Sequence, residues 1–496
     1  MSANELANKR PLIQTKLQGF VLLLTLALLY FPLFLRLDTR PLREWDEARN
    51  AVNAYEMSKT GQFLVKTYDY EPDLWETKPP FLEWLQIIGF KTIGYNELAV
   101  RLPSALASFV MLVFIILWLR KHTQDFQVGI LAALIVVCSN GFIHEHGSRT
   151  GDHDALMIAF TIGFLFNVFQ YLEFKQNKAL MWASLCLSAA VLTKSVAALM
   201  VLPGVLLYVL VQKQLLACLK NKAFWQALGL FLLIILGYYG TREMMAPGYL
   251  TAVWDNEFLP RYLNQSDRFT YTVSEWDFYW KQLKTWQFAY WLPLLLPSFI
   301  LSLAYYKGFY KRLVQMLACV IVLFYLAIAK GSSNVWYDLP LIPLMALIIA
   351  MGLNVVYETI IKSQWKRMTQ IIALLILTVS LFYVPYSEII AKVMDTHETS
   401  AQVMYPEALK RLEKQFPNNK NICLFEPLGS NYPLAFYKHV WTDTKGYHFQ
   451  NRHRNDPFLS GQSVLILKDQ WADFEALKLP CTILISSEFY KWMLIK

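Results

Sequence analysis

The chain has 496 residues, of which 55% are hydrophobic and only 17% are charged, and its formal net charge is +9. Soluble domains are usually about one quarter charged, so the composition excludes a purely soluble protein. Lysine and arginine gather in short loops at every second gap between apolar runs, so the positive charge indicates membrane topology rather than a nucleic-acid partner.

Apolar runs of the length needed to cross a bilayer recur along most of the chain. The N-terminus is polar and basic and no small-residue cleavage site follows its apolar run, so we expect a retained first span. An odd number of spans with a cytoplasmic N-terminus places the C-terminal part outside. The sequence therefore predicts a polytopic α-helical membrane protein with about eleven spans: 17–36, 99–119, 127–143, 154–172, 179–193, 195–212, 223–240, 286–305, 313–329, 338–357 and 368–386.

The first outer loop, 37–98, is too long for a plain connector. From Glu47 onward its apolar residues recur at helical spacing, and Gly61 provides a stop. A second helix is expected after Lys78, with an apolar face. We expect both to be amphipathic helices at the membrane surface. The apolar residues that define the two helices are Ala48, Ala51, Val52 and Tyr55, then Phe81, Leu85, Ile88 and Phe90.

From about residue 390 the composition changes to short β-like runs, "NICLFEP", "LAFYKHV", "SVLILKD" and "CTILISS". The runs "SAQVMYPEALKRLEKQF" and "DQWADFEALKL" between polar turns are typical of helices. This predicts a transmembrane domain at 1–389 and a small extracytoplasmic α/β domain at 390–496. Cys423 and Cys481 begin two of the β-runs, and a disulfide or two buried thiols are both consistent with that position.

Polar residues concentrate in the outer segments 37–98, 144–153, 241–285 and 330–337. Asp46 stands just before the first loop helix, next to Glu47. An aspartate there could cap the helix, or its carboxylate could take a proton from an acceptor hydroxyl. Glu47 could raise the proton affinity of its neighbour or share a metal with it.

Two lysines, Lys78 and Lys194, occupy positions that are unusual for a solvent-exposed cation. Lys78 precedes two prolines, which restrict it to extended geometry and orient its ammonium for a lipid phosphate, although interfacial lysines also snorkel. Lys194 lies between two apolar runs and needs a partner, either a phosphate or Asp154, unless it is the water-exposed tip of a hairpin.

The stretch "HEHGSRTGDHDALM" is the densest polar segment between two spans. Asp154 begins the fourth span, where ionisable groups are functional by default, and Asp152 is the close alternative. Arg149 could contact an anion. A metal site is not excluded, although the spacing matches no strong signature, and its candidate ligands are Asp46, His144, His146 and Asp152.

Later outer segments add hydrogen-bond donors suited to phosphate oxygens, namely Arg261, Lys330 and Tyr337. Separated carboxylates and cations at the membrane level suit the transfer of a sugar from a lipid-linked phosphate. An acidic group would deprotonate the acceptor and the cations would stabilise the leaving phosphate. No G-x-G-x-x-G stretch is present for a soluble nucleotide sugar.

The motifs "WDEAR", "KPPFLEW", "RTGDHDALM", "LTKS" and "KGSSNVWYDLPLIP" occur in this order between residues 45 and 343. With them the chain resembles the GT-C glycosyltransferases that use polyprenyl-phosphate sugars, in particular bacterial aminoarabinose transferases and protein O-mannosyltransferases. The resemblance implies a GT-C fold, with Asp46 as general base and Asp154 as second carboxylate. The residues that it implies for phosphate contacts are Arg49, Lys78, Lys194, Arg261 and Tyr337.

We therefore expect an inverting glycosyltransferase of a bacterial inner membrane, acting on the periplasmic face. The donor is a polyprenyl-phosphate monosaccharide, undecaprenyl-linked, and the acceptor is a lipid A-like glycolipid, a surface polysaccharide or a protein. No cofactor is required, although a divalent cation could assist. The alternatives are a transporter or flippase of lipid-linked sugars, which should carry polar residues at mid-bilayer and often half-repeats, and a catalytically silent receptor.

Overall fold

The computed structural model describes residues 12–43, 45–144, 146–258, 277–329, 333–395, 403–427 and 431–496. The chain forms two compact units, each described by itself below. The helical unit comprises Met1–Arg36, Asp73–Phe81 and Pro103–Asp395, and the sheet unit comprises Leu37–Pro72, Leu82–Leu102 and Thr396–Lys496. The sheet unit thus combines the C-terminal residues with two segments of the first outer loop, and the domain boundary at 389/390 stays a prediction.

Membrane-length helices dominate the chain. Within the described residues, seven helical stretches are long and apolar enough to cross a membrane, or eight if a pair bent by 101° counts as one span. The expected architecture of a multi-pass helical membrane protein is confirmed. The seven are α4 (Glu97–Thr123), α7 (His153–Phe174), the stretch Asn177–Val211, α11 (Lys222–Met245), α16 (Phe309–Ala329), α17 (Leu341–Lys362) and α18 (Arg367–Met394).

Shorter elements complete the helical unit, and the apolar parts of those at the expected spans 17–36 and 127–143 fall short of the length of a candidate span. The bent pair is α14 (Phe278–Gln282) with η4 (Leu283–Gln287), followed by α15 (Leu292–Tyr305). Two further apolar helices fall on expected spans, α1 (Leu12–Phe34) and α5 (Gln127–Val137). The connecting elements are α6 (Asn140–Ile143), α10 (Leu215–Lys220), α12 (Tyr249–Val253) and η3 (Trp254–Phe258).

The stretch Asn177–Val211 is a hairpin of two crossings. It contains α8 (Asn177–Lys194), η2 (Ser195–Val201) and α9 (Leu202–Val211). Lys175, just before α8, donates a hydrogen bond through Nζ to Gln214, just after α9. A straight helix of this length would separate its ends by about 50 Å, so the chain must reverse between them. Ser195, with φ 51°, lies at the reversal, next to the lysine around which the two spans were expected to break.

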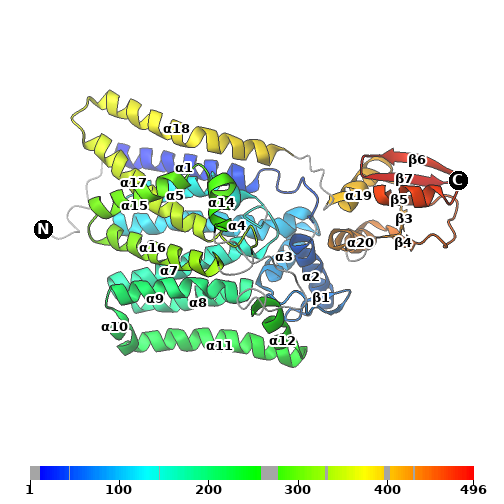
Figure 1. Cartoon of the computed structure of the whole chain (residues 1–496), viewed down its shortest axis with the longest axis horizontal. Coiled ribbons are helices and arrows are strands. Elements are labelled where there is room, and N and C mark those ends of the chain that lie inside the picture. The colour runs from blue at the N-terminus through cyan, green and yellow to red at the C-terminus, as the bar shows by residue number, and fades with distance from the viewer. Residues whose placement is uncertain are drawn as a thin grey trace. The chain divides into compact units, whose positions relative to one another are not determined.

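Packing distinguishes the inner helices of the unit from its outer ones. α17 is buried from Leu341 to Val355 and packs on α5 and α15, while α7 packs on α8 and α8 on α11 (Figure 1). Gly352 allows α17 to approach α15 closely, because a Cβ there would lie 2.3 Å from the Ser298 side chain. In contrast, α11 and α18 expose leucines and isoleucines along their length, as lipid-facing helices do.

In the sheet unit, α2 (Asp46–Thr60) follows the predicted course and ends at Gly61, whose φ of 73° is the left-handed cap of a helix end. Its polar residues are buried as well as its apolar ones, because they pair within the unit. After α2 come the hairpin strands β1 (Thr67–Tyr68) and β2 (Glu71–Pro72). α3 (Phe81–Ile93) follows, and Ile88 on its expected apolar face is 58% exposed.

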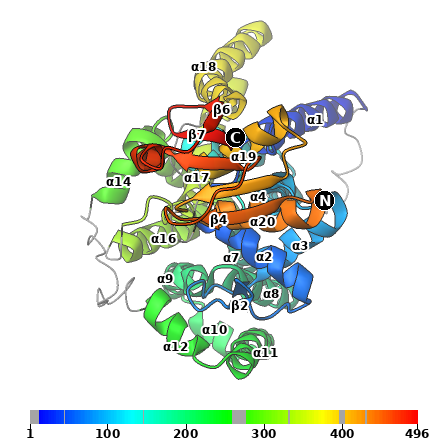
Figure 2. The same ribbon diagram turned by 90° about the vertical axis from the view of Figure 1, so that its right-hand side faces the viewer.

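A five-stranded mixed sheet forms the C-terminal part of the sheet unit, in the order β4-β3-β5-β7-β6 (Figure 1). Figure 2 shows β4, β6 and β7 of this sheet from another side. β3 lies parallel to β4 and β5, and β7 lies antiparallel to β5 and β6. The strands are β3 (Asn421–Phe425), β4 (His448–Arg452), β5 (Ser463–Leu467), β6 (Cys481–Ser486) and β7 (Tyr490–Ile495). The helices beside them are α19 (Met404–Gln415), α20 (Tyr432–Lys445), η6 (Lys468–Gln470) and α21 (Trp471–Glu475).

Three of the four expected β-runs are strands, namely those in β3, β5 and β6. The fourth, "LAFYKHV", was wrong because it lies within α20. Asn431 caps this helix by accepting a hydrogen bond from Leu434, and Pro433 fits its first turn. The apolar residues of the run therefore face one side at helical rather than at strand spacing.

Both cysteines of the C-terminal part are free thiols. Cys423 is in β3 and Cys481 is in β6, and two strands, β5 and β7, lie between these two in the sheet. Since neighbouring strands are about 4.8 Å apart, the two residues lie beyond the reach of a disulfide, which requires Cα atoms within about 7 Å. The alternative of two thiols is correct.

Candidate active site

The first part of the site is the start of α7 in the helical unit. Asp152 caps the helix: its Oδ1 accepts a hydrogen bond of 2.7 Å from the backbone N–H of His153. Its carboxylate also pairs with Nδ1 of His146, whose ring stacks on Trp336 at 3.7 Å between centroids. Burial would raise the pKa of Asp152, but the neighbouring basic groups, with His146 acting most strongly among them, together outweigh burial and lower the pKa below its ordinary value. Asp152 is therefore a fixed negative charge at neutral pH.

Two residues further on, Asp154 forms an ion pair with Nζ of Lys194 at the end of α8. Neither side chain is more than 5% exposed. The ring of Tyr337, which precedes α17, has its centroid 5.8 Å from the same ammonium. The expectation that Lys194 takes Asp154 as partner is confirmed, and the lysine stands at a hairpin turn that is buried rather than exposed to water. Three sequence-predicted residues thus meet in one cluster.

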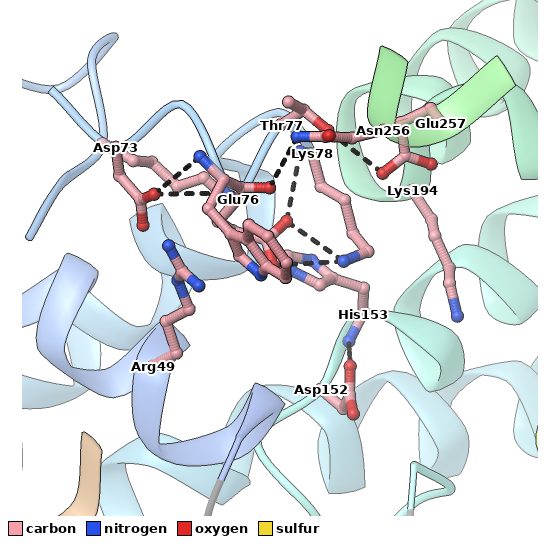
Figure 3. Close-up of polar contacts among 12 residues, drawn as sticks. Arg49, Asp73, Glu76, Thr77, Lys78, Asp152, His153, Lys194, Asn256 and Glu257 are labelled. Atoms are coloured by element: carbon pink, nitrogen blue, oxygen red, sulfur yellow. Dashed lines mark hydrogen bonds and ion pairs between the residues drawn. The ribbon is translucent and has the colours of Figure 1, made fainter. Parts of the chain in front are cut away.

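The loop that precedes α3 positions Lys78. Its ammonium lies 3.0 and 3.1 Å from the two carboxylate oxygens of Glu76, whose Oε1 also accepts from the backbone N–H of Lys78 (Figure 3). Asp73 fixes the turn before it by accepting from the backbone N–H groups of Trp75 and Glu76. The expected pre-oriented lysine is present, and a carboxylate that the sequence reasoning did not single out holds it.

The same loop is held from the other side by α12 and η3. Thr77 donates a hydrogen bond of 3.1 Å to Glu257 (Figure 3). The hydroxyl of Tyr249 donates one of 2.6 Å to the backbone oxygen of Thr77. Sequence reasoning selected only the arginine of the segment "NEFLPRY" and missed its glutamate. A carboxylate directly before an aromatic and an apolar residue was the available signal.

In the sheet unit, the start of α2 carries the other predicted carboxylates. Trp45 occupies the cap position and Asp46 is the first helical residue, half-buried, so the alternative that Asp46 caps the helix was wrong. Glu47 is buried and binds Arg101 in a bidentate pair, with distances of 2.7 and 2.9 Å. Arg49 donates a hydrogen bond of 3.0 Å to the hydroxyl of Tyr432.

Arg101 was not expected as part of this region, because it lies inside an apolar run. Its guanidinium also donates to three backbone carbonyls, those of Leu37, Arg40 and Pro41. These contacts fix the chain that leads into α2. The geometry therefore favours a positioning role for Glu47 within the sheet unit.

The remaining candidates have other surroundings. Arg149 donates hydrogen bonds of 2.9 and 2.7 Å to the backbone oxygens of Pro32 and Leu35 at the end of α1. His144 lies edge-on to Trp286, with 4.9 Å between centroids. Of the four candidate metal ligands, His146 and Asp152 are in contact. Arg261 and Lys330 lie outside the described residues. A metal at the four and an anion at Arg149 stay predictions.

The sequence of this chain is similar to one protein family and to two proteins of Aquifex aeolicus. Residues 77–239 match the family described as dolichyl-phosphate-mannose-protein mannosyltransferase. Two uncharacterized proteins of Aquifex aeolicus (strain VF5) are similar, at 28% identity over 241 residues and 31% over 153 residues, or 48% and 31% of this chain. The matches span only 45% and 34% of the length of these relatives.

Solved structures match over nearly the whole chain. ArnT from Cupriavidus metallidurans bound to undecaprenyl phosphate has a TM-score of 0.68 at 15% identity, covering 96% of this chain and 98% of that one. The oligosaccharyltransferase of Archaeoglobus fulgidus in the apo form has a TM-score of 0.54 at 12% identity, covering 84% and 63%. The chain therefore has the fold of these GT-C membrane glycosyltransferases, and the resemblance found in its motifs is confirmed.

Proposed function

We propose that this chain is an inverting glycosyltransferase that moves a monosaccharide from a polyprenyl phosphate to an acceptor hydroxyl or phosphate group. The observation that carries the proposal is the concentration of fixed charges at the loops that join the membrane-length helices. There Lys78 is held by Glu76, and Lys194 is held by Asp154 beside Tyr337. The fold shared with a structure described as bound to undecaprenyl phosphate supports a donor of the same class.

The donor phosphate would lie among these cations. Lys78 is pre-oriented because two prolines follow it and a carboxylate already fixes its ammonium. A phosphate would compete with Glu76 for that ammonium and form charge-assisted hydrogen bonds. As the bond between the sugar and the phosphate breaks, negative charge grows on the phosphate oxygens, and fixed cations there lower the barrier because no reorganisation is needed.

Asp46 would act as the general base, as the resemblance implies. Its carboxylate is half-buried at the first turn of α2, so it keeps access to an acceptor hydroxyl. It would take the proton as the hydroxyl oxygen attacks the anomeric carbon from the face opposite the leaving phosphate. Attack from that face inverts the linkage. A divalent cation is not required, since a single phosphodiester carries little charge, although one could assist.

The reaction would take place on the periplasmic face of a bacterial inner membrane, with the N-terminus in the cytoplasm. The distribution of lysine and arginine in alternate loops supports this orientation. The acceptor would be a lipid A-like glycolipid, a surface polysaccharide or a protein. The rival reading as a flippase of lipid-linked sugars receives less support, because the charged clusters described here lie at helix ends rather than at mid-helix.

Mass spectrometry of surface glycolipids and glycoproteins from cells with and without the chain tests the proposal and identifies the acceptor. The purified chain is then reconstituted with undecaprenyl-phosphate-linked sugars and that acceptor. We expect a new sugar linkage of inverted configuration. Movement of the donor across the vesicle membrane without a new linkage would instead establish the flippase.

A variant pair sharpens the assay. Lys78→Ala should lower kcat/KM for the donor by about 10- to 100-fold, because a charge-assisted contact worth roughly 1.5–3 kcal/mol is lost. Lys91→Ala is the matched control, since Lys91 is an exposed lysine at the end of α3. Equal kinetics of the two variants would contradict a donor-binding role for Lys78.

A further inference from the structure

A hairpin in the sheet unit brings together three potential metal ligands that the proposed reaction does not use. Strands β1 and β2 are joined by Asp69 and Tyr70, which have φ values of 54° and 63°. Positive φ at both turn residues is typical of a tight two-residue turn. Each of Glu56 on α2, Asp69 in this turn and His439 on α20 has one potential ligand atom within 4.8 Å of the other two.

The carboxylate of Glu56 is divided between two roles. Its Oε2 accepts hydrogen bonds of 2.6 Å from the hydroxyl of Thr67 and 3.0 Å from the backbone N–H of Tyr70, and so holds the hairpin. Its Oε1 is buried and has no hydrogen-bond partner among the described residues. The side chain is 0% exposed. A buried carboxylate oxygen without a partner is costly, so its orientation toward Asp69 and His439 calls for a ligand.

The imidazole of His439 is fixed in place. The ring of Tyr55 stacks on it at 5.4 Å between centroids, and the ring of Tyr70 meets it edge-on at 5.8 Å. Its Nε2 lies 3.9 Å from Oε1 of Glu56, which is too long for a hydrogen bond. Burial lowers the pKa of His439, which favours the neutral ring that binds metals.

We propose that Glu56, Asp69 and His439 bind a divalent transition-metal ion, with Zn²⁺ as the ion that fits them best. Imidazole nitrogen and carboxylate oxygen are both ligand types that zinc binds, and imidazole favours a transition metal over Mg²⁺ or Ca²⁺. Bonds of about 2.1 Å in a tetrahedral site place ligand atoms roughly 3.4 Å apart. The observed 3.9 Å is closed by a small side-chain rotation. The two carboxylates then balance the charge of the ion.

The fourth coordination position has access to solvent. Asp69 and His439 line a hollow of about 440 Å³, together with Lys438, Asp443 and His448. Water or an anionic group could reach the ion from this side. On the protein side the three ligands come from three segments, α2, the hairpin turn and α20. The ion would therefore connect α2 and the hairpin turn, both in the first outer loop, to α20 in the C-terminal part of the same unit.

Metal analysis of the purified, tag-free full chain in detergent tests the site. The chain is stripped with a chelator, titrated with Zn²⁺ and analysed for bound metal. His439→Gln and Asp69→Asn should each bind one Zn²⁺ per chain fewer than the wild type. Asparagine tolerates positive φ, so the second variant keeps the turn. His448→Gln is the matched control, since His448 lines the same hollow but is not in the cluster.

Thermal unfolding gives a second readout that does not depend on activity. At Zn²⁺ concentrations of about one hundred times its Kd, the unfolding transition of the wild type should rise by roughly 5–10 °C, and that of Asp69→Asn should not. Equal zinc stoichiometry in the wild type, His439→Gln and Asp69→Asn would overturn the proposal. So would a wild type that binds no zinc, or an equal loss in His448→Gln.

Discussion

The first turns of α2 and α7 share a pattern of acidic residues, and in both helices one of these acids forms a buried ion pair. Each carries two acidic residues in or next to its first turn, Asp46 with Glu47 and Asp152 with Asp154. In each pair one acid forms a buried ion pair with a distant base, Glu47 with Arg101 and Asp154 with Lys194. Neighbouring carboxylates in one motif therefore have different partners: one binds a distant base, while the other lies at the start of the helix, where Asp152 caps α7 and pairs with His146.

The two buried ion pairs nevertheless differ in the additional contacts that their basic residues make. Arg101 donates to three backbone carbonyls in addition to Glu47, whereas Lys194 has Asp154 as its ion-pair partner and the ring of Tyr337 nearby. Loss of the carboxylate should therefore lower the free energy of unfolding more at α7 than at α2. The predictions below follow the expected change in the free energy of unfolding, from the largest to the smallest.

Asp154→Asn should destabilise the helical unit by about 3–5 kcal/mol, because Lys194 is left as a buried charge without its counter-ion. Thermal unfolding in detergent measures the change. The double variant Asp154→Leu with Lys194→Met should recover much of the loss, since replacing a whole buried pair by apolar residues is often neutral. An Asp154→Asn protein as stable as the wild type would break the comparison.

Glu47→Gln should cost less, about 2 kcal/mol, because Arg101 keeps its carbonyl acceptors and the amide still accepts one hydrogen bond. The measurement is again thermal unfolding, followed by near-ultraviolet signals of the sheet unit. Glu71→Gln serves as the control, since Glu71 is exposed in the hairpin. A larger loss for Glu47→Gln than for Asp154→Asn would reverse the proposed order.

A third buried carboxyl, Asp338, tests whether a buried acid needs a counter-ion to stay ionised in the folded chain. Both of its oxygens are buried, and among the described residues no basic side chain pairs with it. Burial raises the pKa of Asp338 well above its ordinary value, and the Gln287 amide offsets only part of this. The folded chain then holds a proton that the unfolded chain releases above about pH 4, so folding loses stability as pH rises from there.

Asp338→Asn should remove this dependence, because asparagine matches the protonated carboxyl in shape and does not titrate. We expect the variant to be more stable than the wild type at pH 8, with the difference shrinking toward pH 4. Unfolding curves at several pH values give the difference directly. A constant difference across that range would show that Asp338 stays ionised in the folded chain.

Much of the architecture could be predicted because a membrane imposes length and hydrophobicity on its helices. The pairing of Lys194 with Asp154 was also within reach, since a cation between apolar runs needs a partner. Arg101 was missed because it stands near the start of an apolar run, where it falls within the expected span. Its partner Glu47 is 54 residues away. No local pattern carries a pairing over that distance.

The sheet unit was harder to predict from local patterns. The run "LAFYKHV" is short and apolar, and such runs do not separate strand from helix by periodicity alone. The capping residue Asn431 and the following Pro433 were the better guide to α20. The hairpin at Asp69 and Tyr70 gave no glycine or asparagine signal, although its turn has positive φ at both positions.

Asp46→Asn should have the smallest effect on stability and the largest on the reaction. Asp46 is half-buried and is not the cap of α2, so the free energy of unfolding should change less than in Glu47→Gln, where a buried bidentate pair is altered. If Asp46 is the general base, kcat for sugar transfer should fall by about 10²- to 10⁴-fold, while KM for the polyprenyl-phosphate donor stays the same, because proton transfer stabilises only the transition state. Glu71→Gln should change neither quantity. An Asp46→Asn protein that keeps a tenth or more of the wild-type kcat would remove Asp46 from the chemistry.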